Sequence, residues 1–174
     1  MARFDNRLAR HITAAIAGAT FIAAGCSSDS SGDAAQQSSL LTAATLGEQM
    51  ILSTREYLAN APYADADFDN GARQVQICRA CHSLEQGGPV MLGPGLFGMF
   101  GARAGARPGF DYSAVLAEAG FVWTPRALEA WLAAPARFLP GNRMSFPGVL
   151  DATNRVDLVA YLLKVTDDSD KEEQ

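Results

Sequence analysis

The chain of 174 residues contains few of the side chains that hold metal ions, with only three cysteines and two histidines. One of each, Cys26 and His11, lies in an N-terminal stretch that has the features of an export signal. The remaining three are one ligand short of the four that a structural zinc site needs. The chain also lacks an apolar run of about 18 residues, which argues against an ordinary transmembrane helix. Its formal net charge of −5 argues against a nucleic-acid partner.

The first 25 residues resemble a bacterial lipoprotein signal. Arg3, Arg7 and Arg10 supply a positive start, the segment Ile12 to Ala24 is apolar, and small residues precede Cys26. We therefore expect residues 1–25 to be removed and Cys26 to carry a lipid. The protein would then be exported and anchored to a membrane on its periplasmic side. An ordinary cleaved signal with an incidental cysteine is the alternative.

Composition divides the rest of the chain into three parts. Residues 27–37 consist of Ser, Asp, Gly, Ala and Gln, and we expect residues 26–64 to form a tether. Leu46, Met50, Tyr57 and Leu58 recur at helical spacing, which predicts that residues 40–60 of that tether form a helix. This helix could be a spacer, lie on the folded domain or bind a partner. Residues 65–166 should form the folded domain, and the acidic residues 167–174 a solvated tail.

The most informative stretch is Cys78-Arg79-Ala80-Cys81-His82. Two cysteines three apart, followed by histidine, are typical of a c-type haem attachment site. The two thiols can form thioethers with the haem vinyl groups, and the imidazole can then bind the iron. A thioredoxin-like redox pair would need a neighbouring βαβ pattern, which we do not find. A short structural disulfide is a further alternative.

Residue types also predict a partner for the histidine and the limits of three helices. Pro94 lies in the Gly-rich segment after the motif, and its free carbonyl could accept the Nδ1 proton of His82. Asp67 or Asp69 should cap a first helix that runs to Ile77. A second helix should start at Thr124-Pro125 and stop before Pro135, and Asp151 should cap the last one.

The domain resembles class I cytochrome c of the mitochondrial and alphaproteobacterial type from about Phe68 to Val165. The matching pieces, with their spacing, are Cys78-X-X-Cys81-His82, Gly93-Pro94-X-Leu96-X-Gly98, Phe100-Gly101, Gly105, Gly109-Phe110-X-Tyr112-Ser113, Gly120-X-X-Trp123, Leu132-X-X-Pro135, Pro140-Gly141-X-X-Met144-X-Phe146-X-Gly148 and Arg155-X-X-Leu158-X-X-Tyr161-Leu162.

The resemblance implies an all-α fold of about four to five short helices around one haem c, attached through Cys78 and Cys81. It implies that the first and last helices cross near Tyr161. Met144 would be the second iron ligand opposite His82, and a Met/His pair raises the reduction potential.

The resemblance also bears on the surroundings of the cofactor. Tyr112 and Trp123 would donate hydrogen bonds to a haem propionate. Ala102 and Asn142 depart from the family, which often has an arginine and a hydroxyl residue there. Trp131 stands where tyrosine is common, and we hypothesise that its N–H reaches the sulfur of Met144.

Together these observations predict a monohaem electron carrier with no catalytic residues. By resemblance its partners would be a quinol:cytochrome c oxidoreductase and a terminal oxidase. The resemblance places Arg79, Arg137 and Arg143 around the exposed haem edge, where they could form a positive face that steers docking or be solvated surface charges. A haem enzyme or gas-binding module with an open iron position is one alternative. A cytochrome subunit docked on a larger oxidase is the other.

Overall fold

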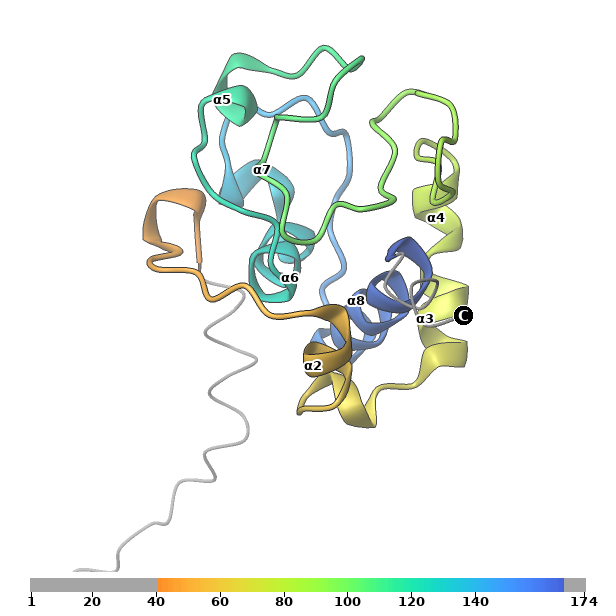
Figure 1. Ribbon diagram of the computed structural model, residues 1–174. Coiled ribbons are helices and arrows are strands. Elements are labelled where there is room, and N and C mark those ends of the chain that lie inside the picture. Colours follow the sequence, from red (N-terminus) through yellow and green to blue (C-terminus); the bar gives the residue numbers. More distant parts are fainter. Residues whose placement is uncertain (1–40, 168–174) are drawn as a thin grey trace, which may run out of the picture.

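The computed structural model describes residues 41–167 (Figure 1). In chain order the elements are η1 (Ala43–Thr45), α2 (Thr54–Leu58), η2 (Tyr63–Asp65), α3 (Phe68–Gln74), α4 (Gln76–Arg79), α5 (Ala114–Ala117), α6 (Pro125–Ala133), α7 (Pro135–Phe138) and α8 (Ala152–Thr166). This range contains no strand, and its extended backbone pairs at one isolated bridge, Arg103 to Val122. The predicted all-α class is confirmed. The helical segments outnumber the predicted four to five, partly because the first helix divides in two at Val75.

Short polar side chains set the start of the main helices, as predicted. Asp67 accepts a hydrogen bond from Asn70 N (2.9 Å) at α3, and Asp151 accepts one from Asn154 N (2.8 Å) at α8. Thr124 caps α6 by accepting from Ala127 N (3.2 Å), with proline at the first helical position. These caps satisfy N–H groups that have no partner inside the helix. These residue types therefore determine where α3, α6 and α8 begin.

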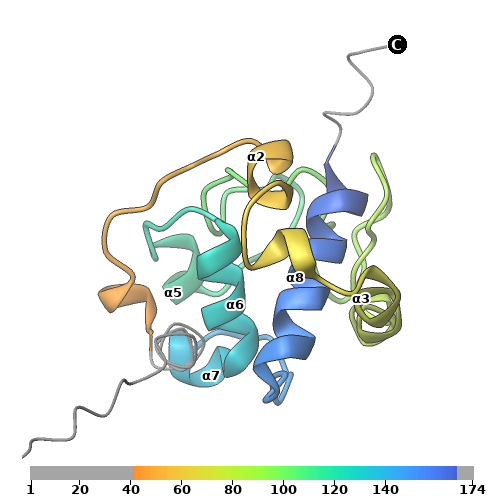
Figure 2. The same cartoon turned by 90° about the horizontal axis from the view of Figure 1, so that it is seen from below.

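The crossing of α3 and α8 forms the centre of the fold, and α8 lies between α3 and α6 (Figure 2). Gly71 makes this crossing possible, because a Cβ atom there would lie 2.3 Å from the carbonyl oxygen of Asp157 and 2.6 Å from Cβ of Tyr161. Polar side chains close the same contact, since Asn70 Nδ2 donates to both Asn154 Oδ1 and Asp157 Oδ2 at 2.7 Å. The predicted crossing near Tyr161 is confirmed.

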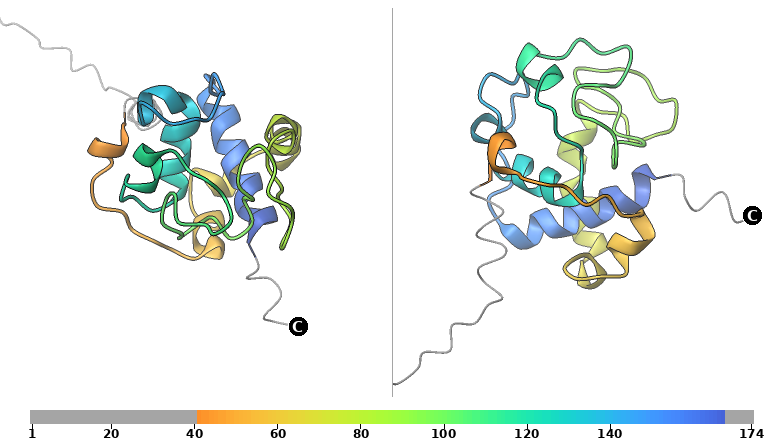
Figure 3. Two further views of the ribbon diagram at one scale, coloured as in Figure 1. Left: turned by 90° about the horizontal axis from the view of Figure 1, so that it is seen from above. Right: turned by 60° about the vertical axis from the view of Figure 1, so that its left-hand side comes forward.

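The prediction of one helix over residues 40–60 is wrong, because only η1 and the short helix α2 (Thr54–Leu58) form within that range. Residues 41–66, which we call the N-terminal strap, contain only the short elements η1, α2 and η2. The strap passes over the outside of the domain in both views of Figure 3, and its elements α2 and η2 contact α8. Gly47 has φ +71°, which interrupts a helix, and the side chain of Gln49 bonds to the backbone of a distant segment. Contacts with distant segments therefore take the place of helical hydrogen bonds here. The apolar residues of the strap do not form one helical face, since Leu46 is buried and Met50 is exposed.

Residues 41–64 are also not a free tether, because Leu46 and Tyr63 are buried in the core of the domain. The expected signal (1–25), Cys26 with the first part of the tether, and most of the acidic tail lie outside the described residues. Within residues 41–167, no helix has both the length and the apolar character to cross a membrane.

Candidate haem site

One turn of backbone carries the two thiols and the imidazole. α4 contains Cys78, and the amides of Cys81 and His82 both donate to its carbonyl, at 3.0 and 2.9 Å. The two cysteines are free and half-buried, so they do not form the disulfide that the sequence left open. Burial raises the pKa of the Cys78 thiol. The arrangement presents two thiols and one imidazole from neighbouring positions, as covalent attachment of one planar cofactor requires.

The imidazole of His82 is held from behind. Its Nδ1 donates to the carbonyl oxygen of Pro94 at 2.7 Å, which leaves Nε2 as the ring nitrogen available to bind a metal. The loop approaches the ring closely, because a Cβ atom at Gly93 would lie 2.2 Å from His82 Cε1. The amide of Gly93 donates to the carbonyl of Cys81 at 2.9 Å, which fastens the loop to the motif. These contacts set the orientation of the ring.

Met144 lies in the loop between α7 and α8, and α6 supports it. Trp131, buried in α6, donates its indole N–H to Met144 Sδ at 3.2 Å. Thioether sulfur is a weak acceptor with a second lone pair, so this contact orients the sulfur and leaves it able to bind a metal. The contact that we hypothesised for Trp131 is present in the structure.

Asn142 organises the loop that carries Met144. Its Nδ2 donates to the carbonyls of Pro135 (2.9 Å) and Leu139 (2.8 Å), and its Oδ1 accepts from the amide of Met144 (2.9 Å). One side chain therefore joins both ends of α7 to the candidate ligand. The sequence marked Asn142 only as a departure from the family, and its place in a Pro-Gly-Asn turn was the available signal.

An aromatic cluster surrounds Trp131. Its ring centroid lies 5.5 Å from that of Trp123 and 5.9 Å from that of Phe138, both nearly perpendicular. Phe121 contacts Trp123 and Phe138 in the same edge-on manner, at 4.8 and 5.4 Å. Edge-to-face packing of this kind is favourable beyond the area it buries. It makes the Met144 side of the site apolar, with Phe121, Trp131 and Phe138 buried.

The expected propionate partners lie in two separate segments. Trp123 precedes α6, and Tyr112 precedes α5, where its ring lies 4.8 Å from that of Phe110. Burial raises the pKa of the Tyr112 phenol, so it stays a hydrogen-bond donor. The neighbouring Ser113 Oγ is buried without a hydrogen-bond partner in the described part of the chain. A carboxylate beside Tyr112 and Ser113 would supply the acceptor that this hydroxyl lacks.

Comparison with known proteins agrees with this geometry. No family model matches the chain. It is 41% identical over 98 residues to a cytochrome c homolog of Bradyrhizobium diazoefficiens (56% of this chain, 53% of the relative). It is 35% identical over 102 residues to cytochrome c2 of Agrobacterium tumefaciens (57% and 92%), and 33% identical over 105 residues to cytochrome c of Kluyveromyces lactis (60% and 96%). The chain belongs to the cytochrome c family. It spans about half the length of the Bradyrhizobium relative and nearly all of the other two.

Members of the cytochrome c family carry one covalently attached haem c, and Cys78 and Cys81 are the attachment residues of this chain. The site fits that group. His82 and Met144 offer a nitrogen and a sulfur, and each is held by a hydrogen bond within the chain. Among residues 41–167, Ser113 Oγ has no hydrogen-bond partner, so it can donate to the cofactor.

Sequence reasoning missed a buried acidic group in this cytochrome. The Tyr63 hydroxyl donates to Glu129 Oε1, which joins η2 of the strap to α6. Burial raises the pKa of Glu129, while the hydrogen bond from Tyr63 and the charge of Arg155 act in the opposite direction. Burial and the adjacent Glu129 carboxylate raise the pKa of Tyr63 as well. No sequence pattern links residues 66 positions apart, so only the fold could reveal this pair.

Proposed function

We propose that this cytochrome is a one-electron carrier on the periplasmic side of a membrane. It would take electrons from a quinol:cytochrome c oxidoreductase and pass them to a terminal oxidase. The observation that carries the proposal is that both candidate axial ligands are already fixed in the chain. His82 bonds to the Pro94 carbonyl at 2.7 Å, and Met144 Sδ accepts from Trp131 at 3.2 Å.

When bound, the haem supplies one-electron iron chemistry. The residues around it limit what else can happen. Ligands that do not move between oxidation states keep the reorganisation small. Trp131 and Phe138, both buried, keep water from the sulfur side. With Met144 in place no iron position would be open to a substrate, which favours a carrier over an enzyme.

Docking by a positive face receives only partial support. Arg143 pairs with Asp111, with 3.2 Å between Nη2 and Oδ2, and also donates to the Asp111 backbone carbonyl. Both side chains are largely exposed, so the pair adds little stability, but it offsets the charge of Arg143. We therefore expect the rate of electron transfer to its partners to depend only moderately on ionic strength.

The anchor is a separate part of the proposal. A lipid on Cys26 would keep the carrier close to complexes in the same membrane. A Cys26→Ser protein, exported behind an ordinary cleaved signal in place of residues 1–25, should appear in the soluble periplasmic fraction with its haem spectrum unchanged. Retention of the Cys26→Ser protein in washed membranes would exclude lipidation as the anchor.

The carrier role can be tested with holoprotein and membrane vesicles that contain both complexes but lack a cytochrome c. Wild-type protein should restore quinol-dependent oxygen uptake and accept one electron per haem. Met144→Ala holoprotein, which opens the second iron position, is the matched control and should restore much less oxygen uptake.

Peroxide turnover by the wild-type protein at the rate of Met144→Ala, without restored oxygen uptake, would favour the enzyme alternative instead. Co-purification of the wild-type protein with an oxidase would favour the docked-subunit alternative.

A further inference from the structure

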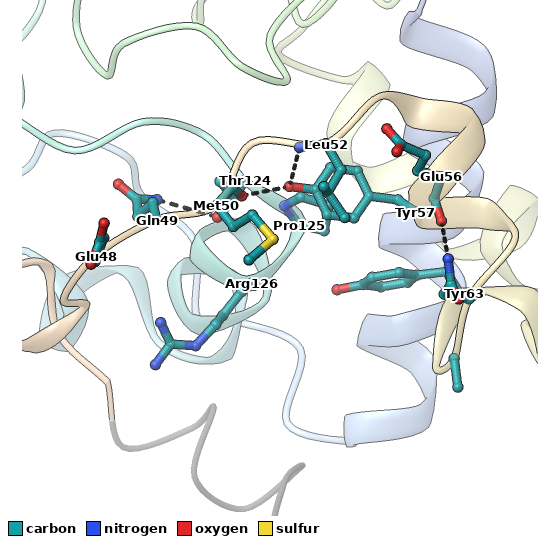
Figure 4. A pocket seen from close by; sticks show the side chains of 12 residues that line it. Glu48, Gln49, Met50, Leu52, Glu56, Tyr57, Tyr63, Thr124, Pro125 and Arg126 are labelled. Atoms are coloured by element: carbon teal, nitrogen blue, oxygen red, sulfur yellow. Dashed lines mark hydrogen bonds between the residues drawn. The ribbon is translucent and has the colours of Figure 1, made fainter.

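The strap is fastened to the domain through one side chain in particular. Gln49 Oε1 accepts from the amide of Val122 at 2.8 Å, and its Nε2 donates to the Val122 carbonyl at 2.5 Å and to Thr124 Oγ1 at 3.2 Å. These two residues flank Trp123 on either side. Figure 4 shows Gln49 reaching from the strap to Thr124 at the start of α6. The amide of Gln49 thus pairs with the backbone beside Trp123 as a neighbouring strand would.

Backbone bonds hold the same segment from its other side. The amide of Trp123 donates to the carbonyl of Ala102, and the amide of Gly101 donates to the carbonyl of Trp123, both at 2.9 Å. Ile51 of the strap reaches this layer too, because its Cγ2 lies 3.6 Å from where a Cβ atom on Gly101 would be. The segment around Trp123 therefore lies between the loop at Ala102 and the strap. Hydrogen bonds therefore hold it on both sides.

Other strap contacts are independent of Gln49. Arg126 Nη1 donates to the carbonyl of Leu46 at 2.7 Å, and the Tyr63 hydroxyl donates to Glu129. Tyr57 stiffens the strap internally, since its hydroxyl donates to the Met50 carbonyl at 2.9 Å and accepts from the amide of Leu52 at 3.2 Å. Because these contacts fasten the strap elsewhere, the effect of Gln49 on Trp123 can be separated from the effect of the strap on stability.

We propose that Gln49 is a positioning residue of the haem pocket, through which the strap holds Trp123 against a haem propionate and raises the reduction potential. A donor held on the carboxylate spreads its negative charge and so weakens its preference for oxidised iron. Ala102 offers no charged donor where the family often has arginine, so the position of Trp123 matters more in this chain. The inference rests on the haem c assignment and not on the proposed carrier role.

The test compares the midpoint potentials of purified holoproteins across pH. Gln49→Met keeps the length of the side chain and removes all three hydrogen bonds. Met50→Ala is the neighbouring control, because the Met50 side chain is 75% exposed. Arg126→Ala loosens the strap at Leu46 without touching Gln49. If Gln49→Met does not load haem, Gln49→Asn, which shortens the reach of the amide, is measured in its place.

At pH values above the pKa of the propionate, Gln49→Met should have a lower midpoint potential than the wild type. At pH values below that pKa, the midpoint potentials of the two proteins should become equal. The far-red sulfur-to-iron band should persist, because Met144 is not affected. Arg126→Ala should lower the melting temperature but keep the wild-type potential at every pH. A wild-type potential in Gln49→Met at every pH would overturn the proposal. Equal shifts in potential in Gln49→Met and Arg126→Ala would also overturn it, because they would make the effect a general loss of stability. No redox partner enters these measurements, so failure of the carrier role would leave them unaffected.

Discussion

Replacing Trp131 with phenylalanine should lower the reduction potential. The substitution keeps an aromatic ring in the cluster but removes the N–H that lies 3.2 Å from Met144 Sδ. A donor on the sulfur draws electron density away from the thioether and thereby favours reduced iron. Without that donor, sulfur becomes a better ligand for oxidised iron.

The size of the change follows from the strength of the bond. A hydrogen bond of this kind contributes about 0.5–1.5 kcal/mol, and only its difference between the two oxidation states affects the potential. A difference of about 0.5–1 kcal/mol corresponds to about 20–40 mV for one electron. The smaller ring also leaves space beside Phe138, so the free energy of unfolding should fall by about 1–3 kcal/mol.

The assay is a potentiometric titration of the holoprotein, combined with the pH at which the far-red band is lost. Trp131→Phe should lower the potential and raise that pH, because the sulfur binds oxidised iron more strongly. Trp131→Tyr restores a donor and should recover part of both changes. An unchanged potential and an unchanged pH of band loss in Trp131→Phe would refute the reasoning. Identical shifts in the two variants would attribute the effect to packing instead.

Three further predictions concern the loop, the buried carboxyl and the helix crossing. Asn142→Ala removes hydrogen bonds of 2.8–2.9 Å to three backbone groups, and should weaken Met144 ligation by about 1–3 kcal/mol, seen as carbon monoxide binding to the reduced protein. Because the pKa of Glu129 is raised, its protonation stabilises the folded protein at pH values below 4.5, the ordinary pKa of this carboxyl. This contribution is lost as the pH rises through the pKa of Glu129 in the folded state. Glu129→Gln, which stays neutral, should therefore gain in unfolding free energy relative to wild type as pH rises above 4.5. Gly71→Ala places a Cβ atom 2.3 Å from a backbone oxygen of α8, and should lower the free energy of unfolding by about 1–3 kcal/mol.

Each of these has an outcome that would contradict it. Asn142→Ala with no carbon monoxide binding would show that the loop holds Met144 without this side chain. A constant difference in unfolding free energy between Glu129→Gln and wild type from pH 4 to 8 would mean that Glu129 titrates normally in the folded protein. A stable Gly71→Ala protein would show that α3 and α8 can separate at little cost. Ala72→Gly, beside Gly71 in α3, is a control for helix propensity alone.

The sequence predicted best the features that depend on neighbouring residues. Asp67, Thr124 and Asp151 cap helices because a short polar side chain reaches N–H groups two or three positions ahead. The bond from His82 to the Pro94 carbonyl was also foreseeable, since a ligating imidazole needs an acceptor and proline leaves its carbonyl free.

What could not be predicted depends on distant segments. Leu46 and Met50 have helical spacing, yet Leu46 is buried and Met50 is 75% exposed, because the strap between them is not helical. The side chain of Gln49 forms hydrogen bonds with residues more than seventy positions away, and no local sequence pattern predicts such contacts. The roles of His82 and Met144 as iron ligands stay predictions, which only spectra of the haem-loaded protein can test.

The most direct test of the account is therefore spectroscopic, on purified holoprotein. The oxidised form is recorded in the far red, where sulfur-to-iron charge transfer gives a weak band, and the reduced form is then exposed to carbon monoxide. The account predicts the band and no carbon monoxide binding, as expected for iron closed by His82 and Met144. Absence of the band together with ready carbon monoxide binding would contradict it and leave the iron open to a substrate or gas.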